Sequence, residues 1–279
     1  IHIFNYNYIV DGKKFLEEPI GVYADLLTHE VSFITTLKNN LRNLNQIFIE
    51  CDIEIERLIS KTFATGVELL SNEEMESGSI LIDIGFQKIS LGLFKNLALV
   101  HSTTFPFGTN YIAKDISKVC SLTFNESKKI IRDIDYLFTD QQKAFDEEGY
   151  LKNIYFFESN FRKISKKLIL NIIKARLDEI INITKKNLTF PGHNLDLVTK
   201  ILLIGNGINY FNIKKYIFNF LGKNVTEINS REIIDKNLSS CLGAVKIVKD
   251  GWETEAIPNI SDRNIEKMGF FAKIFGINK

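Results

Sequence analysis

The chain has 279 residues, of which 45% are hydrophobic and 25% charged, and its formal net charge at pH 7 is +1. This composition is typical of a soluble globular protein, and the length allows one large domain or two to three smaller ones. The balanced charge lacks the clustered Lys and Arg of a nucleic-acid-binding surface, so no nucleic-acid partner is expected.

The cysteines argue against a disulfide framework and a zinc knuckle. Cys51, Cys120 and Cys241 are far apart and none belongs to a C-x-x-C pair, which fits a reducing cytosol. The histidines show no metal-ligand spacing. No apolar run approaches the ~20 residues of a membrane span, and Ile1–Tyr8 alternates like a strand rather than resembling a signal peptide.

The first part of the chain predicts a small α+β module. Apolar and polar residues alternate in the expected strands, and Asp11-Gly12 is a hairpin-type turn. One helix carries an apolar stripe of Leu37, Leu41, Leu44, Ile47 and Phe48. The expected elements are strands at Ile1–Val10, Ile20–Ala24 (weaker), His29–Thr36 and Ile53–Ile59, and a helix at Thr36–Cys51.

The remaining elements predict a meander of strands, then helices, then a strand–turn–helix unit. The expected strands are Ile80–Ile84, Ile89–Phe94, Leu97–Thr104, Leu197–Ile204 and Val225–Ile228. The expected helices are Thr62–Leu70, Asn110–Val119, Asn125–Phe138, Asn160–Asn187, Phe211–Leu221 and Ser240–Val248. The expected connectors are Ser71–Gly78, Gln141–Gly149 and the linker Asp250–Asp262.

Asp83 lies inside an apolar run and is followed, after one residue, by Gly85. A buried strand does not favour an ionised carboxylate, because burial is costly without a partner or a bound ion. An Asp at a strand end beside a glycine turn suits Mg²⁺ and phosphate, the Asp holding the metal and the glycine admitting backbone N–H groups. The alternative is an Asx turn, and the pattern alone favours it.

Two further patterns suit a nucleotide. Gly205-Asn206-Gly207 follows an apolar strand and opens a helix, which places backbone N–H groups near an anion or packs a nucleotide against bare backbone. The alternative is an ordinary helix start. Arg176 and Glu179 lie three residues apart on one side of the long helix, where the alternative is a surface ion pair of little energetic value.

The end of the chain has an amphipathic pattern. Arg263–Phe275 presents aromatic and aliphatic residues on one helical face and carries basic residues at its edges. Such a helix can lie in a membrane interface with its lysines toward anionic headgroups, or it can dock on the protein body. The candidate membrane-binding residues are Met268, Phe270, Phe271, Lys273, Ile274 and Phe275.

The order of these motifs resembles the second half of an actin-like ATPase, and most closely the FtsA family. The motifs are the strand Ile80–Gly85, the segment Phe107–Ile116, the A-R-x-x-E helix around Arg176 and the strand ending in Gly205-Asn206-Gly207. The resemblance implies an α/β (α+β) chain with a partial actin-like, ribonuclease H-like ATPase fold and an inserted SHS2-type subdomain 1C.

The resemblance also implies domain boundaries and a missing front end. The expected parts are the end of subdomain 1A (1–12), subdomain 1C (13–60), a helix and connector of 1A (61–78), the first part of 2A (79–118), subdomain 2B (119–191), the second part of 2A (192–249), a linker (250–262) and an amphipathic helix (263–279). The first phosphate motif of the family is absent, so the chain is expected to start partway through the protein.

By resemblance, Asp83 and Gly85 correspond to the second phosphate motif, with Asp83 the metal ligand, and Gly205 and Gly207 to the adenosine motif. Arg176 and Glu179 correspond to the helix facing the nucleoside. The cofactors implied are ATP and Mg²⁺.

Phe86 and Gln87 replace glycines of the phosphate motif, and Asn206 replaces the middle glycine of the adenosine motif, so we expect no efficient ATPase activity. Sequence reasoning alone identifies no catalytic residue.

The function implied is that of a cell division protein of the divisome, a peripheral tether at the septum. It would link the FtsZ ring, through the FtsZ carboxy-terminal peptide, to anionic lipids on the cytoplasmic face of the inner membrane, and self-associate. Family members end in an amphipathic anchor, which favours lipid over docking for Arg263–Phe275. The alternative is an actin-like ATPase of the pilus-assembly or shape-determining type.

Overall fold

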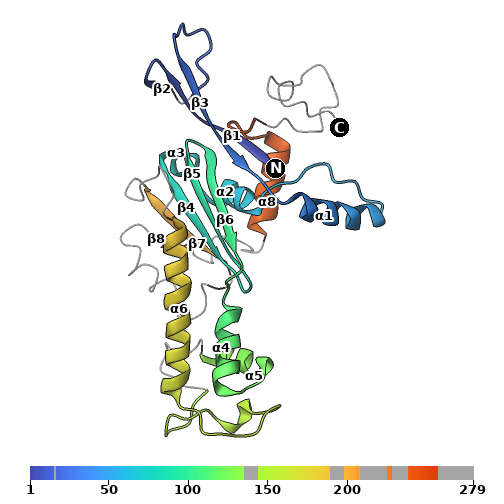
Figure 1. Cartoon of the computed structure of the whole chain (residues 1–279), viewed down its shortest axis with the longest axis vertical. Helices are drawn as coiled ribbons and strands as arrows, with labels where there is room; N and C mark the ends of the chain where they lie inside the picture. The colour runs from blue at the N-terminus through green and yellow to red at the C-terminus, as the bar shows by residue number, and fades with distance from the viewer. Residues whose placement is uncertain are drawn as a thin grey trace. The chain divides into compact units, whose positions relative to one another are not determined.

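The computed structural model describes residues 1–15, 17–134, 144–188, 198–205, 207, 225–227 and 238–256 (Figure 1). The chain divides into two compact units. The first contains Ile1–Leu81, Gly92–Ser102 and the described residues after Ile233. The second contains Ile82–Leu91 and the described residues between Thr103 and Glu232.

A three-stranded antiparallel sheet begins the chain, in the order β2-β1-β3. Its strands are β1 (His2–Val10), β2 (Lys13–Phe15) and β3 (Leu27–Ile34). Asp11 and Gly12 both have positive φ, 48° and 81°, so the predicted hairpin turn is confirmed. The strand predicted at Ile20–Ala24 is wrong, because Gly21 turns the chain with a φ of 78°.

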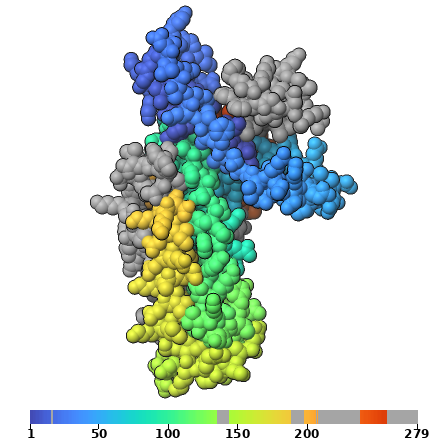
Figure 2. All heavy atoms as spheres, viewed as in Figure 1, coloured from blue at the N-terminus to red at the C-terminus, as the bar shows by residue number. Residues whose placement is uncertain are grey.

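Helix α1 (Lys38–Glu50) forms where the sequence predicted it, but none of its residues is buried. On the face of the molecule shown in Figure 2, no other described residue covers this helix. The strand predicted at Ile53–Ile59 is wrong, since these residues form no described ladder. The described sheet β2-β1-β3 is completed without this segment.

Two helices, α2 (Lys61–Leu69) and α8 (Ser239–Asp250), pack together in the first unit. Gly243 allows this contact, because a Cβ there would overlap the Ala64 carbonyl. The predicted connector after α2 instead contains a short helix, α3 (Asn72–Ser77), which begins with a Ser71–Glu74 capping box.

The second sheet has five strands in the order β6-β5-β4-β7-β8. They are β4 (Ser79–Ile84), β5 (Ile89–Lys95), β6 (Ala98–Phe105), β7 (Lys200–Ile204) and β8 (Val225–Glu227), with β7 and β8 parallel. All five predicted strands are therefore confirmed within a few residues. Their side chains form a tight core, in which Ile80, Ile82 and Leu91 are fully buried.

The second unit contains α4 (Asn110–Cys120), α5 (Phe124–Ile134), a 3₁₀ turn η2 (Asn153–Tyr155) and α6 (Lys166–Leu188). Helices α4 and α6 pack against each other (Figure 1). Helix α6 begins six residues later than predicted at Asn160, because Leu151 N–H binds the Ile164 carbonyl and holds that segment extended.

Two predicted elements lie outside the described residues: the helix Phe211–Leu221 and the amphipathic segment Arg263–Phe275. The first part of the predicted linker is described, and it binds the first unit. Trp252 Nε1 and Thr254 Oγ1 both donate to the Leu97 carbonyl, at 2.7 and 2.8 Å. Within the described ranges, no helix has the length and apolar character that a membrane crossing needs.

Candidate functional site

Asp83 and the Gly205–Gly207 turn are brought together at the ends of neighbouring strands β4 and β7. Gly205 has a φ of 97°, and a Cβ there would overlap both the Asp83 carboxylate and the Ile84 carbonyl. A Cβ on Gly207 would come within 2.6 Å of the same carbonyl and 3.0 Å of Thr109 Cγ2. Both positions therefore require glycine, since any side chain would push the two strand ends apart.

The turn after β4 is fastened to the start of α4. Gly85 N–H donates to the Lys88 carbonyl at 2.9 Å, while the Gly85 carbonyl accepts from Thr109 N–H at 3.2 Å. The Phe86 carbonyl accepts from Asn110 N–H at 2.8 Å. These bonds rigidify the turn, but they also occupy the Gly85 N–H, which a phosphate-binding turn would aim at its ligand.

Arg176 joins α6 to α4. Its Nε and Nη2 donate to the two oxygens of Asp115 at 2.5 and 2.8 Å, and its Nη1 donates to Glu179 at 2.5 Å. The hydrogen bonds to Asp115 raise the pKa of the guanidinium further, against the opposing effect of burial. Its Cζ also lies 5.6 Å from the centre of the Tyr111 ring. The i, i+3 pair with Glu179 is thus one part of a larger network.

Sequence reasoning missed Asp115 as a member of this network. The only signal for it in the sequence is its place in the family-like segment Phe107–Ile116, which assigns this carboxylate no role. The described contacts of Arg176 and Glu179 run to α4 and to each other. The four other predicted nucleotide residues gather at the β4 and β7 strand ends. The predicted membrane-binding residues, Met268 to Phe275, lie outside the described part of the chain.

A nucleotide fits this arrangement only in part. Gly205 and Gly207 bring the end of β7 against Asp83 and Ile84, which places the predicted adenosine turn beside the predicted metal ligand. The phosphate side does not fit, because Phe86 and Gln87 place side chains on the turn and the Gly85 N–H is already bonded. A nucleotide bound here would therefore have no phosphate cradle beside Asp83 to complete a magnesium site. The described residues contain no group of three His, Cys, Asp or Glu side chains able to hold a metal.

Solved structures show which fold this arrangement belongs to. MreB5 of Spiroplasma citri bound to AMPPNP superimposes with a TM-score of 0.57 at 17% identity, over 76% of this chain and 65% of that one. A PilM–PilN type IV pilus biogenesis complex gives a TM-score of 0.51 at 11% identity, over 82% of this chain and 63% of that one. The mixed α/β fold is therefore actin-like.

Curated relatives are described as cell division protein FtsA. The protein from Buchnera aphidicola (subsp. Acyrthosiphon pisum) is 23% identical over 99% of this chain and 67% of its own length. That from Neisseria meningitidis serogroup B is 25% identical over 73% of this chain and 48% of its own length. That from Bacillus subtilis is 27% identical over 66% of this chain and 41% of its own length.

This chain thus spans between 41% and 67% of the length of these relatives. The family model described as cell division protein FtsA matches residues 80–262, which is more than half of the chain. That stretch includes the β4 turn, the Arg176 network and the Gly205–Gly207 turn. The chain belongs to the FtsA family.

Proposed function

We propose that this chain acts in cell division as a peripheral tether between a filament of FtsZ and the cytoplasmic face of the inner membrane. The observation that carries the proposal is the FtsA family match over residues 80–262. Fold likeness to the PilM–PilN complex supports the pilus-assembly alternative less, because at 11% identity it reflects the shared fold alone.

The membrane contact is assigned to Arg263–Phe275. Its apolar face carries Met268, Phe271 and Phe275, and lysines flank that face. Aromatic rings at the acyl boundary and lysines at anionic headgroups are the physical basis of such binding. Vesicles containing anionic lipid should sediment the chain, and Phe271→Glu with Phe275→Glu should abolish sedimentation. Undiminished binding of the double variant contradicts the membrane assignment.

The FtsZ contact is assigned to subdomain 2B, residues 119–191. Exposed aromatic side chains there, Phe157 and Phe161 at 52% and 57% exposure, favour docking of a short peptide. Lys129 and Lys163 stand beside aromatic rings in the same region and supply positive charge. A fluorescent FtsZ carboxy-terminal peptide should bind this chain in an anisotropy titration, and Phe157→Ser with Phe161→Ser should weaken it. Equal affinity for the double variant contradicts this surface.

Self-association would strengthen both contacts. Several weak lipid helices and several weak peptide sites on one assembly bind a membrane and a filament far more tightly than one copy does. The subdomain boundaries expected from the sequence, including an SHS2-type subdomain 1C at 13–60, belong to this same proposal. Nucleotide, where bound, would contact the Gly205–Gly207 turn without efficient hydrolysis.

A further inference from the structure

Helix α1 exposes a continuous apolar stripe. Leu37, Leu41, Leu44 and Phe48 follow each other at three- and four-residue spacing and therefore share one helical face. Leu37 is 72% exposed and Leu44 is 40% exposed. An exposed stripe of this length on a helix normally marks a surface that another apolar element covers.

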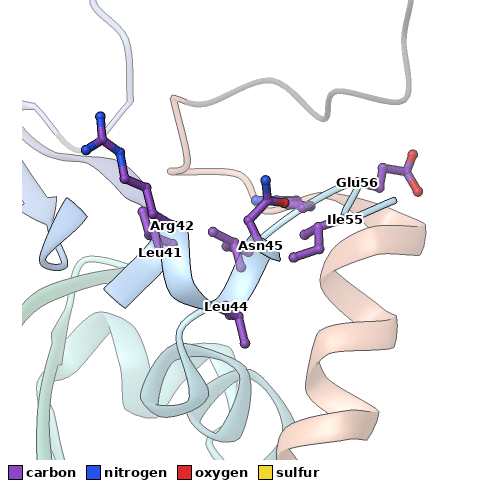
Figure 3. Close-up of a pocket in the computed structure, with 8 residues that line it drawn as sticks. Leu41, Arg42, Leu44, Asn45, Ile55 and Glu56 are labelled. Atoms are coloured by element: carbon purple, nitrogen blue, oxygen red, sulfur yellow. The ribbon is translucent and has the colours of Figure 1, made fainter. Parts of the chain in front are cut away.

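Leu41 and Leu44 of this stripe line an open pocket of about 330 Å³ (Figure 3). Leu41 and Leu44 come from α1, and Ile55 and Leu58 come from the extended segment that follows it. Three charged side chains also line the pocket, Arg42, Glu56 and Arg57. We call the eight pocket-lining residues the α1 groove. Its apolar side chains fit the apolar face of an amphipathic helix.

The chain after α8 is fixed to the wall of the α1 groove. Arg57, which lines the pocket, forms an ion pair with Glu255. His2 Nε2 accepts from Ser60 N–H at 2.8 Å, so the protonated Nδ1 donates to the same Glu255 at 2.6 Å. Although burial opposes ionisation, the bonds from His2 and Arg57 hold the pKa of Glu255 below its ordinary value. The described part of the chain therefore ends beside the groove.

The segment beyond this anchor has an apolar face that matches the apolar lining of the groove. Arg263–Phe275 carries one apolar face and the basic residues Arg263, Lys267 and Lys273. As a helix its 13 residues would measure about 20 Å, the same length as the 13-residue α1. The intervening residues 257–262 span up to roughly 20 Å when extended. The segment can therefore reach the α1 groove without moving the Glu255 anchor.

We propose that Arg263–Phe275 docks into the α1 groove of its own chain. Apolar side chains of the segment cover Leu41 and Leu44. A link this short gives the segment a millimolar effective concentration at the groove. Docking and lipid binding exclude each other because both use the Phe271 and Phe275 rings. The exclusion rests on the proposed membrane function, whereas the docking does not.

A vesicle titration tests the exclusion. Leu44→Asp should disrupt the groove and lower the lipid concentration for half-binding about twofold or more, because more of the segment is then free. Asn43→Asp adds the same charge to the opposite face of α1 and should leave that concentration unchanged. A Leu44→Asp variant that binds vesicles no better than wild type or the Asn43→Asp control overturns the exclusion.

A fluorescence measurement tests the docking without any lipid. Cys51, exposed at the end of α1, is labelled with bimane in a Cys241→Ser background, and tryptophan is placed as Ile265→Trp or Phe275→Trp. One of these should quench the bimane, independently of protein concentration, and Leu44→Asp should relieve the quenching. Absence of quenching in both variants overturns the docking. Quenching that fades on dilution assigns the groove to a second copy and overturns docking within one chain.

The two measurements separate the inference from the proposed function. Quenching without any vesicle binding supports the docking and contradicts the membrane tether. Vesicle binding without quenching supports the tether and contradicts the docking.

Discussion

The carboxylate of Asp115 on α4 is held by the guanidinium of Arg176 on α6 through two hydrogen bonds, 61 residues apart in the chain. The side chains are 20% and 26% exposed, so solvent screens the pair only in part. A planar, two-pronged contact of this kind fixes the relative placement of two helices.

Loss of this contact should destabilise the second unit. Arg176→Lys keeps the charge but cannot form both bonds, and it should cost about 1–2 kcal/mol in urea unfolding. Glu179→Gln is the matched control, because Glu179 is 51% exposed and its pair with Arg176 should contribute less than about 0.5 kcal/mol. Equal losses for the two variants contradict a special role for Asp115.

Glu126 should make the protein acid-sensitive. It is fully buried and accepts hydrogen bonds from Thr123 N–H, Glu158 N–H and both donors of Ser159. Burial alone would raise its pKa, but these bonds lower the pKa from 4.5 to about 2. A lowered carboxyl pKa contributes stability that is complete above the unfolded pKa and is lost as the pH falls toward the folded one.

The free energy of unfolding should therefore drop by up to about 3 kcal/mol between about pH 5 and pH 2 because of this one group. Glu126→Gln should be less stable at pH 7 and should lose that part of the pH dependence. The measurement is urea unfolding across this range for both proteins. If the free energy of unfolding falls with pH equally in the wild type and in Glu126→Gln, the decline comes from other carboxyl groups.

Gly205→Ala should disrupt the strand ends at the candidate site. Alanine is strained at a φ of 97°, and its Cβ would overlap Asp83 and Ile84. We expect a loss of about 2 kcal/mol or more by thermal unfolding. Gly149→Ala is the control, because its φ of 79° imposes similar strain while nothing lies within 4 Å. Equal losses of stability in the two variants would show that backbone strain alone, without the close approach to Asp83 and Ile84, explains the need for glycine at position 205.

The sequence predicts the strands that build this site well and the contacts between distant side chains poorly. Strands β4, β5, β6 and β7 follow from apolar runs bounded by turns. Periodicity also placed the α1 stripe on one face, but it does not say whether anything covers that face. The wrong strand at Ile53–Ile59 has the same cause, since alternation does not say whether a segment pairs with a neighbouring strand.

Two helix starts carry local capping signals in the sequence. Ser71 with Glu74 and Thr123 with Glu126 are S/T-x-x-E boxes, and both begin helices in the structure. By contrast, the pairing of Arg176 with Asp115 has no signal in spacing, because two helices far apart in sequence must first pack together. The resemblance of Phe107–Ile116 to a family motif identifies the segment that contains Asp115, but it does not identify Arg176 as the partner of Asp115.

The phosphate groups of a nucleotide should add little to its binding affinity. In the proposed function a nucleoside would contact the Gly205–Gly207 turn, whereas the β4 turn has its Gly85 N–H bonded to Lys88 and carries Phe86 where a glycine would admit phosphate. Isothermal titration should therefore give similar, weak affinities for Mg-ATP and adenosine, with no phosphate released. A site with a working phosphate turn would prefer Mg-ATP by far more than about tenfold, a difference of about 1.4 kcal/mol. Micromolar affinity for Mg-ATP accompanied by turnover contradicts this prediction.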